Sequence, residues 1–479
     1  MENRVLDPEP VSSLDDYVAA GGGQGLEAAQ RLGPAGVIDE VHASGLRGRG
    51  GAGFLTGVKW RTVAENSSPV VSATVVVNAA EGEPGTFKDR AIMRTNPYRA
   101  LEGALIAASA VGADGIIVAL KASFQQETAR MRAAIDEVRS HGWADGIDIF
   151  VVEGPGHYLY GEETALLEVI AGRNPFPRIA PPFRHGVDES GMETKSAAGE
   201  TMATSESESP VPPTLVNNLE TISNVPAILA QGADWFRSLG TDQSPGTVVC
   251  TVSGQTRRHG VGEFPLGTPL SEVIATVGGG PLPERRLVAA MSGVASPLVP
   301  EALFDTPLTY EAMEEIGSGL GAAGFIVFDD SNDLVAVAEG VSRFLAVESC
   351  GQCTPCKQDG LSLSELLGRV RGGELDGTEV DAIRDLVSTV AEEARCFLAH
   401  QHQRVVGSVL SLLPDDFGTD RARKTPAAER ELIAPIADIQ DGVATLDEKQ
   451  SRKQPDWTFN DVYSGQSPAD RVNQTAEQL

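Results

Sequence analysis

Three cysteines lie within seven residues in the stretch Glu348-Ser-Cys350-Gly-Gln-Cys353-Thr-Pro-Cys356-Lys. This spacing crowds three sulfur atoms into one loop, which no hydrophobic core requires. A [4Fe–4S] cluster does require it, because its irons take thiolates from nearby positions and the fourth ligand can come from far along the chain. Only Cys396 follows, forty positions after Cys356. The pattern therefore predicts a [4Fe–4S] cluster on these four cysteines.

Two other uses of these cysteines are less consistent with the pattern. A structural zinc site usually has two separated ligand pairs, and the spacing here leaves no second pair. Disulfide bonds are disfavoured because we expect no secretory signal at the N-terminus and hence a reducing, cytoplasmic location. The fifth cysteine, Cys250, lies in an apolar run and is predicted to be a small buried hydrophobic residue.

Length and charge limit the classes of protein that the chain can belong to. Its 479 residues predict two to four domains, each with its own core. The net charge of −29 excludes nucleic acid as the expected partner, because a phosphate backbone would be repelled. The longest apolar stretch, residues 100–120, contains Glu102 and Asp114, so we expect a buried helix and strand and no membrane insertion.

A glycine-rich segment, Gly45-Leu-Arg-Gly-Arg-Gly-Gly-Ala-Gly53, combines five glycines with two arginines. Gly48-x-Gly50-x-x-Gly53 has the spacing of the dinucleotide-binding fingerprint, but that motif should follow a strand. A helical pattern over residues 36–44 precedes it here, so an ordinary glycine-rich turn is the alternative. The interleaved arginines favour a phosphate-binding loop, since guanidinium groups and exposed backbone N–H groups both suit phosphate.

Strand and helix patterns alternate through the N-terminal third. Strands are expected at 70–78, 115–120 and 147–153, with helices at 97–111 and 124–140 between them. Such alternation predicts an α/β fold with a largely parallel sheet and ligands at the carboxyl ends of its strands. Glu162 and Glu163 begin another helix, where compensation of the helix dipole is an alternative role. Asn217 and Asn218 could likewise only cap a helix.

The rest of the chain changes character several times. We expect an α/β domain over 1–244, with a flexible acidic insertion at 188–209. Short strands at 245–330 predict a small α+β domain, and amphipathic helices at 331–415 predict a bundle that returns Cys396 to the other cysteines. Residues 416–479 form a predicted partner-binding tail with a hairpin at Asp441-Gly442.

Five ordered motifs together resemble one family. They are Gly45-Leu-Arg-Gly-Arg-Gly-Gly-Ala-Gly-Phe54, Glu83-Pro-Gly-Thr-Phe-Lys-Asp-Arg90, Tyr160-Gly-Glu-Glu-Thr-Ala-Leu166, Val216-Asn-Asn-Leu-Glu-Thr221 and the cysteine segment. The family is that of the NADH-binding flavoprotein (51 kDa-type) subunits of respiratory complex I and of related NAD-dependent formate dehydrogenases and hydrogenases. The resemblance, over about 30–415, implies a Rossmann-like FMN domain, a ubiquitin-like (SLBB) domain and a C-terminal helical bundle with an iron–sulfur cluster.

The resemblance also implies site residues. Those expected to surround FMN are Gly48, Arg49, Gly50, Lys59, Asn78, Tyr158, Gly161, Glu162, Asn217, Asn218 and Thr221. Those expected to contact NADH are Phe54 and Phe183, which would stack on it, with Glu81 and Glu163 as ribose and nicotinamide contacts. An acidic ribose partner repels a 2′-phosphate, so NADH should be preferred over NADPH.

The chain departs from the family pattern at several positions. Ala80 stands where an aspartate is usual, Leu55 where a proline is usual, and Tyr160 where a cysteine is usual. The segment after Cys396 lacks the usual proline-rich sequence. The electron path that the resemblance implies does not depend on these residues.

The function implied by the resemblance is that of an NAD(H)-oxidoreductase (diaphorase) subunit. Hydride would pass between NADH and FMN, and single electrons between FMN and the [4Fe–4S] cluster. The expected partners are a small [2Fe–2S] subunit and a further electron-transfer subunit. The alternatives are an NAD⁺-reducing subunit of a formate dehydrogenase or hydrogenase, and a flavin-free iron–sulfur scaffold. The cofactors carry the chemistry, so no catalytic side chain is assigned.

Overall fold

The computed structural model describes residues 3–68, 72–184, 186–187, 212–373, 377–413 and 429–455. The chain forms two compact units. The first comprises Met1–Gly82, Lys88–Val249 and Gly262–Gly267, and the second comprises Glu83–Phe87, Cys250–Val261 and Thr268–Leu479. The insertion predicted at 188–209 lies outside the described residues. Within the described part of the chain, no helix is both long and apolar enough to cross a membrane.

The first unit contains a four-stranded sheet, and all of its strands are parallel. The strands are β1 (Ala73–Asn78), β2 (Ala113–Lys121), β3 (Asp148–Gly154) and β4 (Thr214–Asn218), in the order β3-β2-β1-β4. The apolar run of β1 is buried, as expected for a strand covered on both faces. The predicted α/β fold with a parallel sheet is thus confirmed, whereas β4 was not predicted as a strand.

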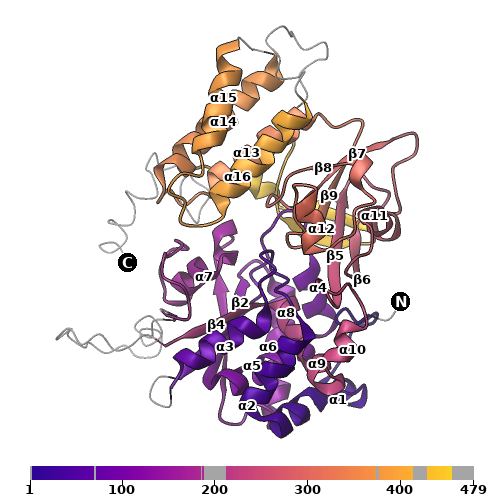
Figure 1. Ribbon diagram of the computed structural model, residues 1–479, viewed down its shortest axis with the longest axis vertical. Coiled ribbons are helices and arrows are strands. Elements are labelled where there is room, and N and C mark those ends of the chain that lie inside the picture. The colour runs from indigo at the N-terminus through magenta and orange to yellow at the C-terminus, as the bar shows by residue number, and fades with distance from the viewer. Residues whose placement is uncertain are drawn as a thin grey trace, which may run out of the picture. The chain divides into compact units, whose positions relative to one another are not determined.

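Helix α5 (Pro97–Val111) shows how the local sequence builds this layer (Figure 1). The side chain of Asn96 caps its first turn, Pro97 occupies the first helical position, and Gly112 ends it in the left-handed conformation. Its surface is rich in alanine and glycine because it packs closely. A Cβ on Gly103 would lie 2.1 Å from the carbonyl oxygen of Ile222.

The other helices of the first unit cover or flank the sheet, and α2 has a kink at Gly33, where φ is +69° before Pro34. They are α1 (Leu14–Ala19), α2 (Gln24–Ser44), α3 (Thr56–Asn66), α4 (Lys88–Thr95), α6 (Gln125–Ser140), α7 (Glu163–Ile170), α8 (Leu219–Ser223), α9 (Val225–Gln231) and α10 (Ala233–Arg237), with the 3₁₀ turn η1 (Tyr158–Gly161).

A second, mixed sheet has the strand order β6-β5-β9-β7-β8. Its strands are β5 (Thr247–Gly254), β6 (Gly260–Pro265), β7 (Leu287–Ser292), β8 (Val299–Pro300) and β9 (Gly324–Asp329), accompanied by α11 (Leu270–Gly278), α12 (Tyr310–Glu315) and the 3₁₀ turn η4 (Glu301–Leu303). Cys250 is fully buried in β5, as predicted. This region has the short strands and single longer helix that the sequence predicts for a small α+β domain.

Four helices follow in the second unit and pack on one another (Figure 1). They are α13 (Leu334–Glu348), α14 (Thr354–Gly372), α15 (Gly377–Thr389) and α16 (Leu398–Leu412). Asp333 caps α13 through hydrogen bonds from two backbone N–H groups. The cysteine segment interrupts the helices between α13 and α14, as the sequence predicts.

The described part of the C-terminal tail packs on its own chain. Strands β10 (Ile436–Gln440) and β11 (Val443–Leu446) form an antiparallel hairpin, followed by the 3₁₀ turn η5 (Glu448–Ser451). Asp441 and Gly442 have φ values of 50° and 77°, which are the signs that a type I′ turn needs. The predicted hairpin is therefore confirmed. Partner binding by the tail, and the boundaries of the four predicted domains, remain predictions.

Candidate functional site

The parallel sheet has a topological switch point between β1 and β4. The chain order runs outward from β1 through β2 to β3 on one side, and β4 lies on the other side of β1. Ligands of open α/β sheets bind in the crevice beyond the carboxyl ends of the strands at such a point. Asn78 ends β1, Asn218 ends β4, and the two are paired in register. Two of the predicted flavin contacts therefore lie side by side at this edge.

The glycine-rich segment forms a loop between α2 and α3 and lies against the end of β4. Its base is closed by a bridge between Arg47 and Leu55, and the N–H of Gly48 donates to the carbonyl of Phe54 at 2.8 Å. A Cβ on Gly50 would lie 3.2 Å from the Cβ of Asn218. The predicted glycine loop and the switch point thus form one site, although a helix and not a strand precedes the loop.

Arg49 fixes this loop from the inside. Its backbone N–H donates to the hydroxyl of Thr221 at 2.8 Å, and the guanidinium donates to the carbonyls of Arg47, Pro245 and Thr247. The side chain is buried and 4.0 Å from Glu220. Arg49 and Thr221 therefore hold the loop in place, and direct contact of the Arg49 guanidinium with a cofactor phosphate remains a prediction.

Two more predicted flavin contacts are fixed by hydrogen bonds. The indole N–H of Trp60 donates to Oδ1 of Asn217 at 2.8 Å, and both residues are buried. The side-chain amide of Asn78 donates to the carbonyl of Gly161 at 2.9 Å. This bond ties η1, which contains Tyr158, to the end of β1. Trp60 was not predicted as a site residue; the one signal for it was a tryptophan in the first turns of α3.

A buried charge network lies beside Asn218 and was also missed. The ammonium of Lys88 donates to Oδ1 of Asp89 at 3.0 Å and to Oδ1 of Asn218 at 3.1 Å, and it lies 2.8 Å from Oε2 of Glu220. The amide of Asn218 donates to Asp89 at 2.8 Å. The signal for this network in the sequence was the charged run at residues 88–90. Charged side chains that are buried are almost always paired with one another.

Burial and mutual attraction decide the protonation of this network. Burial raises the pKa of Asp89, and Lys88 opposes that shift. Burial alone would lower the pKa of Lys88, but the carboxylates of Asp89 and Glu220 outweigh it and raise the pKa. Lys88 is therefore a permanently charged anchor that orients Asn218 toward the switch point.

The four predicted carboxylate and lysine contacts occupy different environments. Glu81 is buried, and its carboxylate accepts from Nε of Arg90 at 2.9 Å and from the N–H of Asp89 at 3.2 Å. Glu162 caps α7 by accepting from two backbone N–H groups, the alternative that the sequence left open, and burial raises its pKa. Glu163 and Lys59 form a half-exposed ion pair. An NADH contact by Glu81 remains a prediction that requires its pairing with Arg90 to open.

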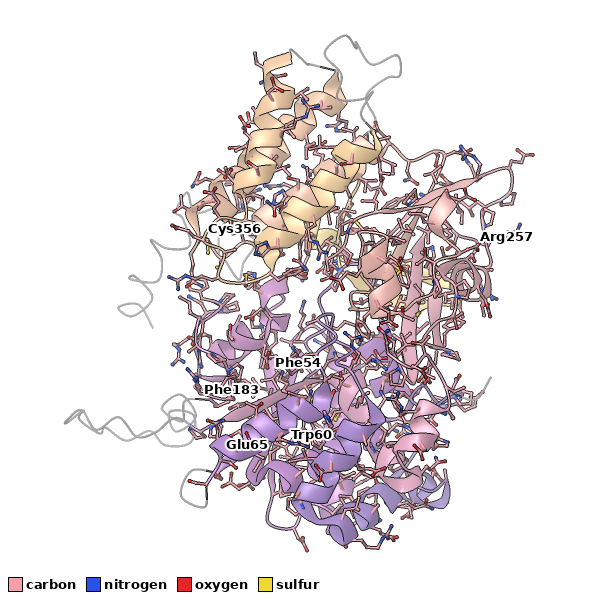
Figure 2. The ribbon with its side chains drawn as sticks, viewed as in Figure 1. Phe54, Trp60, Glu65, Phe183, Arg257 and Cys356 are labelled. Carbon is pink, nitrogen blue, oxygen red and sulfur yellow. The ribbon has the colours of Figure 1, made fainter. Side chains whose placement is uncertain are left out.

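The two predicted stacking aromatics differ in exposure. The side chain of Phe54 is 58% exposed, whereas Phe183 is half-buried beneath the guanidinium of Arg184. In Figure 2, Phe54 lies at the end of the glycine loop and Trp60 lies further along on α3. A large exposed aromatic beside a glycine loop suits a planar ring, which would cover it. The glycines, amides and lysine together fit a flavin mononucleotide, and the exposed aromatic leaves a face for the nicotinamide nucleotide.

The cysteine loop brings all four predicted cluster ligands into one region. Nε2 of Gln352 donates to the sulfur of Cys350 at 3.5 Å, and the backbone N–H of Arg395 donates to the sulfur of Cys353 at 3.4 Å. Arg395 also donates to the side chain of Gln352. Because Arg395 immediately precedes Cys396, the helix α15 and its connection return the fourth cysteine to the loop.

The donor set fits an iron–sulfur cluster better than a single metal ion. Burial raises the pKa of Cys350, and raises that of Cys356 to about 11, so both are thiols until a metal replaces the proton. Among the described residues, no three His, Cys, Asp or Glu side chains converge so as to hold one metal ion. A cubane cluster instead takes each thiolate on a separate iron, and so accepts more widely spaced sulfurs.

A parallel sheet with a glycine loop at its switch point, joined to a four-cysteine helical region, defines a flavin- and iron–sulfur-binding class of electron-transfer protein. Comparison with protein families agrees. Residues 41–227 match the Nuo51 FMN-binding domain, and residues 336–420 match the NADH-ubiquinone oxidoreductase-F iron–sulfur binding region. The predicted FMN and [4Fe–4S] cofactors are confirmed at this level.

Comparison with two individual proteins identifies the family of the chain. It is 36% identical to the second NADH-quinone oxidoreductase F subunit of Rhizobium meliloti, over 80% of this chain and 89% of that protein. It is 37% identical to the NADH-quinone oxidoreductase F subunit of Rickettsia typhi, over 76% of this chain and 83% of that protein. The chain belongs to this family, that of the 51 kDa-type flavoprotein subunits.

Solved structures give the same answer. The chain resembles the crystal structure of an NAD⁺-reducing [NiFe]-hydrogenase in the H₂-reduced state, with a TM-score of 0.73 and 29% identity over 88% of this chain and 69% of that one. The air-oxidised state of an NAD⁺-reducing [NiFe]-hydrogenase matches with a TM-score of 0.71 and 30% identity, over 85% of this chain and 66% of that one. The family resemblance and the predicted fold class, an α/β fold with an FMN-binding domain and an iron–sulfur region, are confirmed. The ubiquitin-like (SLBB) assignment of the small α+β domain remains a prediction.

Proposed function

We propose that this chain is the NAD(H)-oxidoreductase subunit of a multi-subunit dehydrogenase or hydrogenase. The observation that carries the proposal is the meeting of the glycine loop, Asn78 and Asn218 at the switch point of the parallel sheet. When bound, FMN exchanges hydride with NADH and single electrons with the [4Fe–4S] cluster. The part of the protein is to bind, orient and shield, so no general acid or base is assigned.

Each group of residues has a distinct task toward the flavin. Gly48 and Gly50 leave room for the flavin phosphate beside the exposed backbone of the loop. Asn217, held by Trp60, and Asn218, held by Lys88, present amide groups of fixed orientation. Such preset donors and acceptors lose little freedom when the cofactor binds.

The nicotinamide nucleotide is proposed to lie outside the flavin. Phe54 is sufficiently exposed to stack on it, and Phe183 offers a second aromatic face. The half-exposed carboxylate of Glu163 can accept a hydrogen bond from NADH, and an acidic group near the ribose 2′-OH disfavours NADPH. Glu81 would contribute to the same discrimination once released from Arg90.

Exposure around the cysteines indicates the side from which electrons pass onward. Cys350 and Cys356 are buried, whereas Cys353 and Cys396 are half-exposed. We propose that a small [2Fe–2S] subunit and a further electron-transfer subunit complete the path, in the cytoplasm. The [NiFe]-hydrogenase likeness favours a second candidate, in which the same path runs toward NAD⁺.

The visible spectrum of the purified protein under anaerobic conditions tests the proposal. NADH should bleach the flavin absorbance within the mixing time, and NADPH should do so much more slowly. A protein with cluster absorbance but no flavin band would instead be an iron–sulfur scaffold, and the proposal would fall. Hydrogen or formate reducing NAD⁺ in the co-purified complex would identify the second candidate.

A further inference from the structure

The segment 429–455 lies beyond the iron–sulfur match, yet it returns to the helix that precedes the cysteine loop. A Cβ on Gly340 of α13 would lie 2.3 Å from the carbonyl oxygen of Glu431. Ile433 and Ile436 are buried. The segment 429–455 therefore packs closely against α13.

The end of the segment carries a buried ion pair. The ammonium of Lys453 lies 2.6 Å from Oε1 of Glu348 and donates to it, and Nε2 of Gln450 donates to the same oxygen at 3.1 Å. Arg343 donates to the backbone carbonyl of Lys453 at 3.1 Å. The side chains of Glu348 and Lys453 are 2% and 10% exposed. A buried carboxylate in this position requires its cation, because an unpaired one costs several kcal/mol.

This ion pair lies at the start of the cysteine loop. Glu348 ends α13 and stands two residues before Cys350. The next residue, Ser349, approaches the sulfur of Cys356 through its hydroxyl at 3.2 Å, and its carbonyl accepts from the ammonium of Lys357 at 2.9 Å. The backbone that carries the first cysteine is thus fixed on one side by Lys357 from α14 and on the other by Lys453 from the tail.

We propose that Lys453 is a positioning residue for the iron–sulfur cluster. It acts through Glu348, holds the first cysteine of the loop in its cluster-binding position, and compensates the negative charge of a carboxylate two residues before that cysteine. This inference rests on the proposed function in one respect, namely that the chain binds the [4Fe–4S] cluster. No other residue of the segment 429–455 is assigned a part in electron transfer.

The charge of Lys453 determines the direction in which the midpoint potential of the cluster should shift when this residue is replaced. A cluster with four thiolates is anionic and becomes more so when it is reduced, so nearby charges set its potential. In the variant Lys453→Met, the Glu348 carboxylate loses the ammonium that lies 2.6 Å from it, and reduction becomes less favourable. The midpoint potential should shift to a more negative value, and the loosened loop should lose iron several-fold faster in air.

The experiment uses the full chain with both cofactors. The cluster potential is measured by electron paramagnetic resonance during a redox titration, and iron loss by the decay of the cluster absorbance. Lys449→Met is the matched control, because Lys449 lies on η5 four residues earlier and its side chain is exposed to solvent. Lys453→Arg should restore both properties in large part.

A double variant keeps the test decisive if Lys453→Met folds poorly. Glu348→Gln with Lys453→Met removes both charges, and its potential should return toward that of the unmutated protein. Equal potentials and equal iron loss in the Lys453 and Lys449 variants would overturn the proposal. NADH bleaching of the flavin in the unmutated protein is scored separately, so a failure of the proposed function is distinguished from a failure of this inference.

Discussion

The flavin region and the cysteine loop hold their functional groups in different ways. At the switch point, Lys88, Asp89 and Asn218 bond to one another at 2.8 to 3.1 Å with no cofactor needed to complete the set. In the cysteine loop, Ser349, Gln352 and Arg395 contact the sulfurs at 3.2 to 3.5 Å, which are ordinary lengths for hydrogen bonds to sulfur. Among the described residues, however, no three of the thiols converge so as to hold one metal ion. The first region is organised in advance, whereas the second has donors that only a metal cluster brings together fully.

This difference has a thermodynamic consequence. Preset polar groups bind a cofactor without large rearrangement, so loss of FMN should leave the first unit folded. Thiols whose pKa values are raised by burial must release protons when iron binds, and the binding free energy then contributes to folding. Removal of the cluster should therefore destabilise the second unit more than removal of FMN destabilises the first.

The largest expected effect is loss of the cluster in Cys396→Ala. Iron content should fall from about four atoms per chain to about three or fewer, because three thiolates leave one iron of the cubane without a protein ligand. Flavin content should remain close to that of the unmutated protein. Cys250→Ala is the control, since Cys250 is buried in β5 and should leave iron unchanged. Full iron retention without Cys396 would show that the fourth ligand is another residue.

Next in size is Lys88→Met, which breaks the network in the flavin region. Asp89 would lose its cation and Glu220 would lose the nearer of two, since Arg49 lies 4.0 Å from it, at a cost of roughly 3–5 kcal/mol in the free energy of unfolding. Chemical denaturation followed by tryptophan fluorescence measures this. A loss under about 1 kcal/mol would mean that the network is not the organising feature that we describe.

The helical bundle should show a pH dependence that arises from one buried histidine. Burial lowers the pKa of His402 to about 3, and its Nε2 bonds to the hydroxyl of Ser342 at 2.6 Å. The unfolded chain takes up this proton near pH 6.5, so the stability is present above that pH and is lost as pH falls toward 3. Over this range of about 3.5 pH units, the loss should reach roughly 5 kcal/mol.

His402→Gln removes this titration, and it should flatten the fall of the melting temperature between pH 7 and pH 4. The comparison is between slopes, so a constant destabilisation by the substitution does not affect it. An unchanged slope would mean that His402 is protonated in the folded protein.

Lys59→Met should have the smallest effect on stability. Its ion pair with Glu163 is 26% and 36% exposed, so the free energy of unfolding should change by less than about 1 kcal/mol. The KM for NADH should rise, because the loss of Lys59 removes a cation beside the glycine loop that would attract the anionic nucleotide. A stability loss equal to that of Lys88→Met would contradict the contrast between buried and half-exposed pairs.

Sequence patterns predicted the architecture better than the interactions. The apolar run of β1 and the apolar helical stretch of α5 predicted both elements, and the cysteine spacing predicted the loop between α13 and α14. β4 was missed because Thr214–Asn218 is short and has no alternating pattern. A strand of five residues is too short for its hydrophobic pattern to be recognised in the sequence.

The site was predicted in position but not in contacts. Asn78 and Asn218 are paired by sheet register, which sequence spacing cannot show because residues 79–217 intervene. The engagement of Glu81 by Arg90, and of the Arg49 guanidinium by backbone carbonyls, depends on packing between segments that no local pattern joins. Lys453 reaches Glu348 over a separation of 105 residues, and no sequence motif marks it.

The central claim is that one chain carries a flavin at the β1/β4 switch point and a [4Fe–4S] cluster on its four grouped cysteines. Low-temperature electron paramagnetic resonance of the anaerobic protein mixed with NADH tests it most directly. We predict the signal of a reduced [4Fe–4S] cluster in the unmutated protein and its absence in Cys396→Ala, with the flavin bleached in both. A bleached flavin with no cluster signal in the unmutated protein would contradict the account.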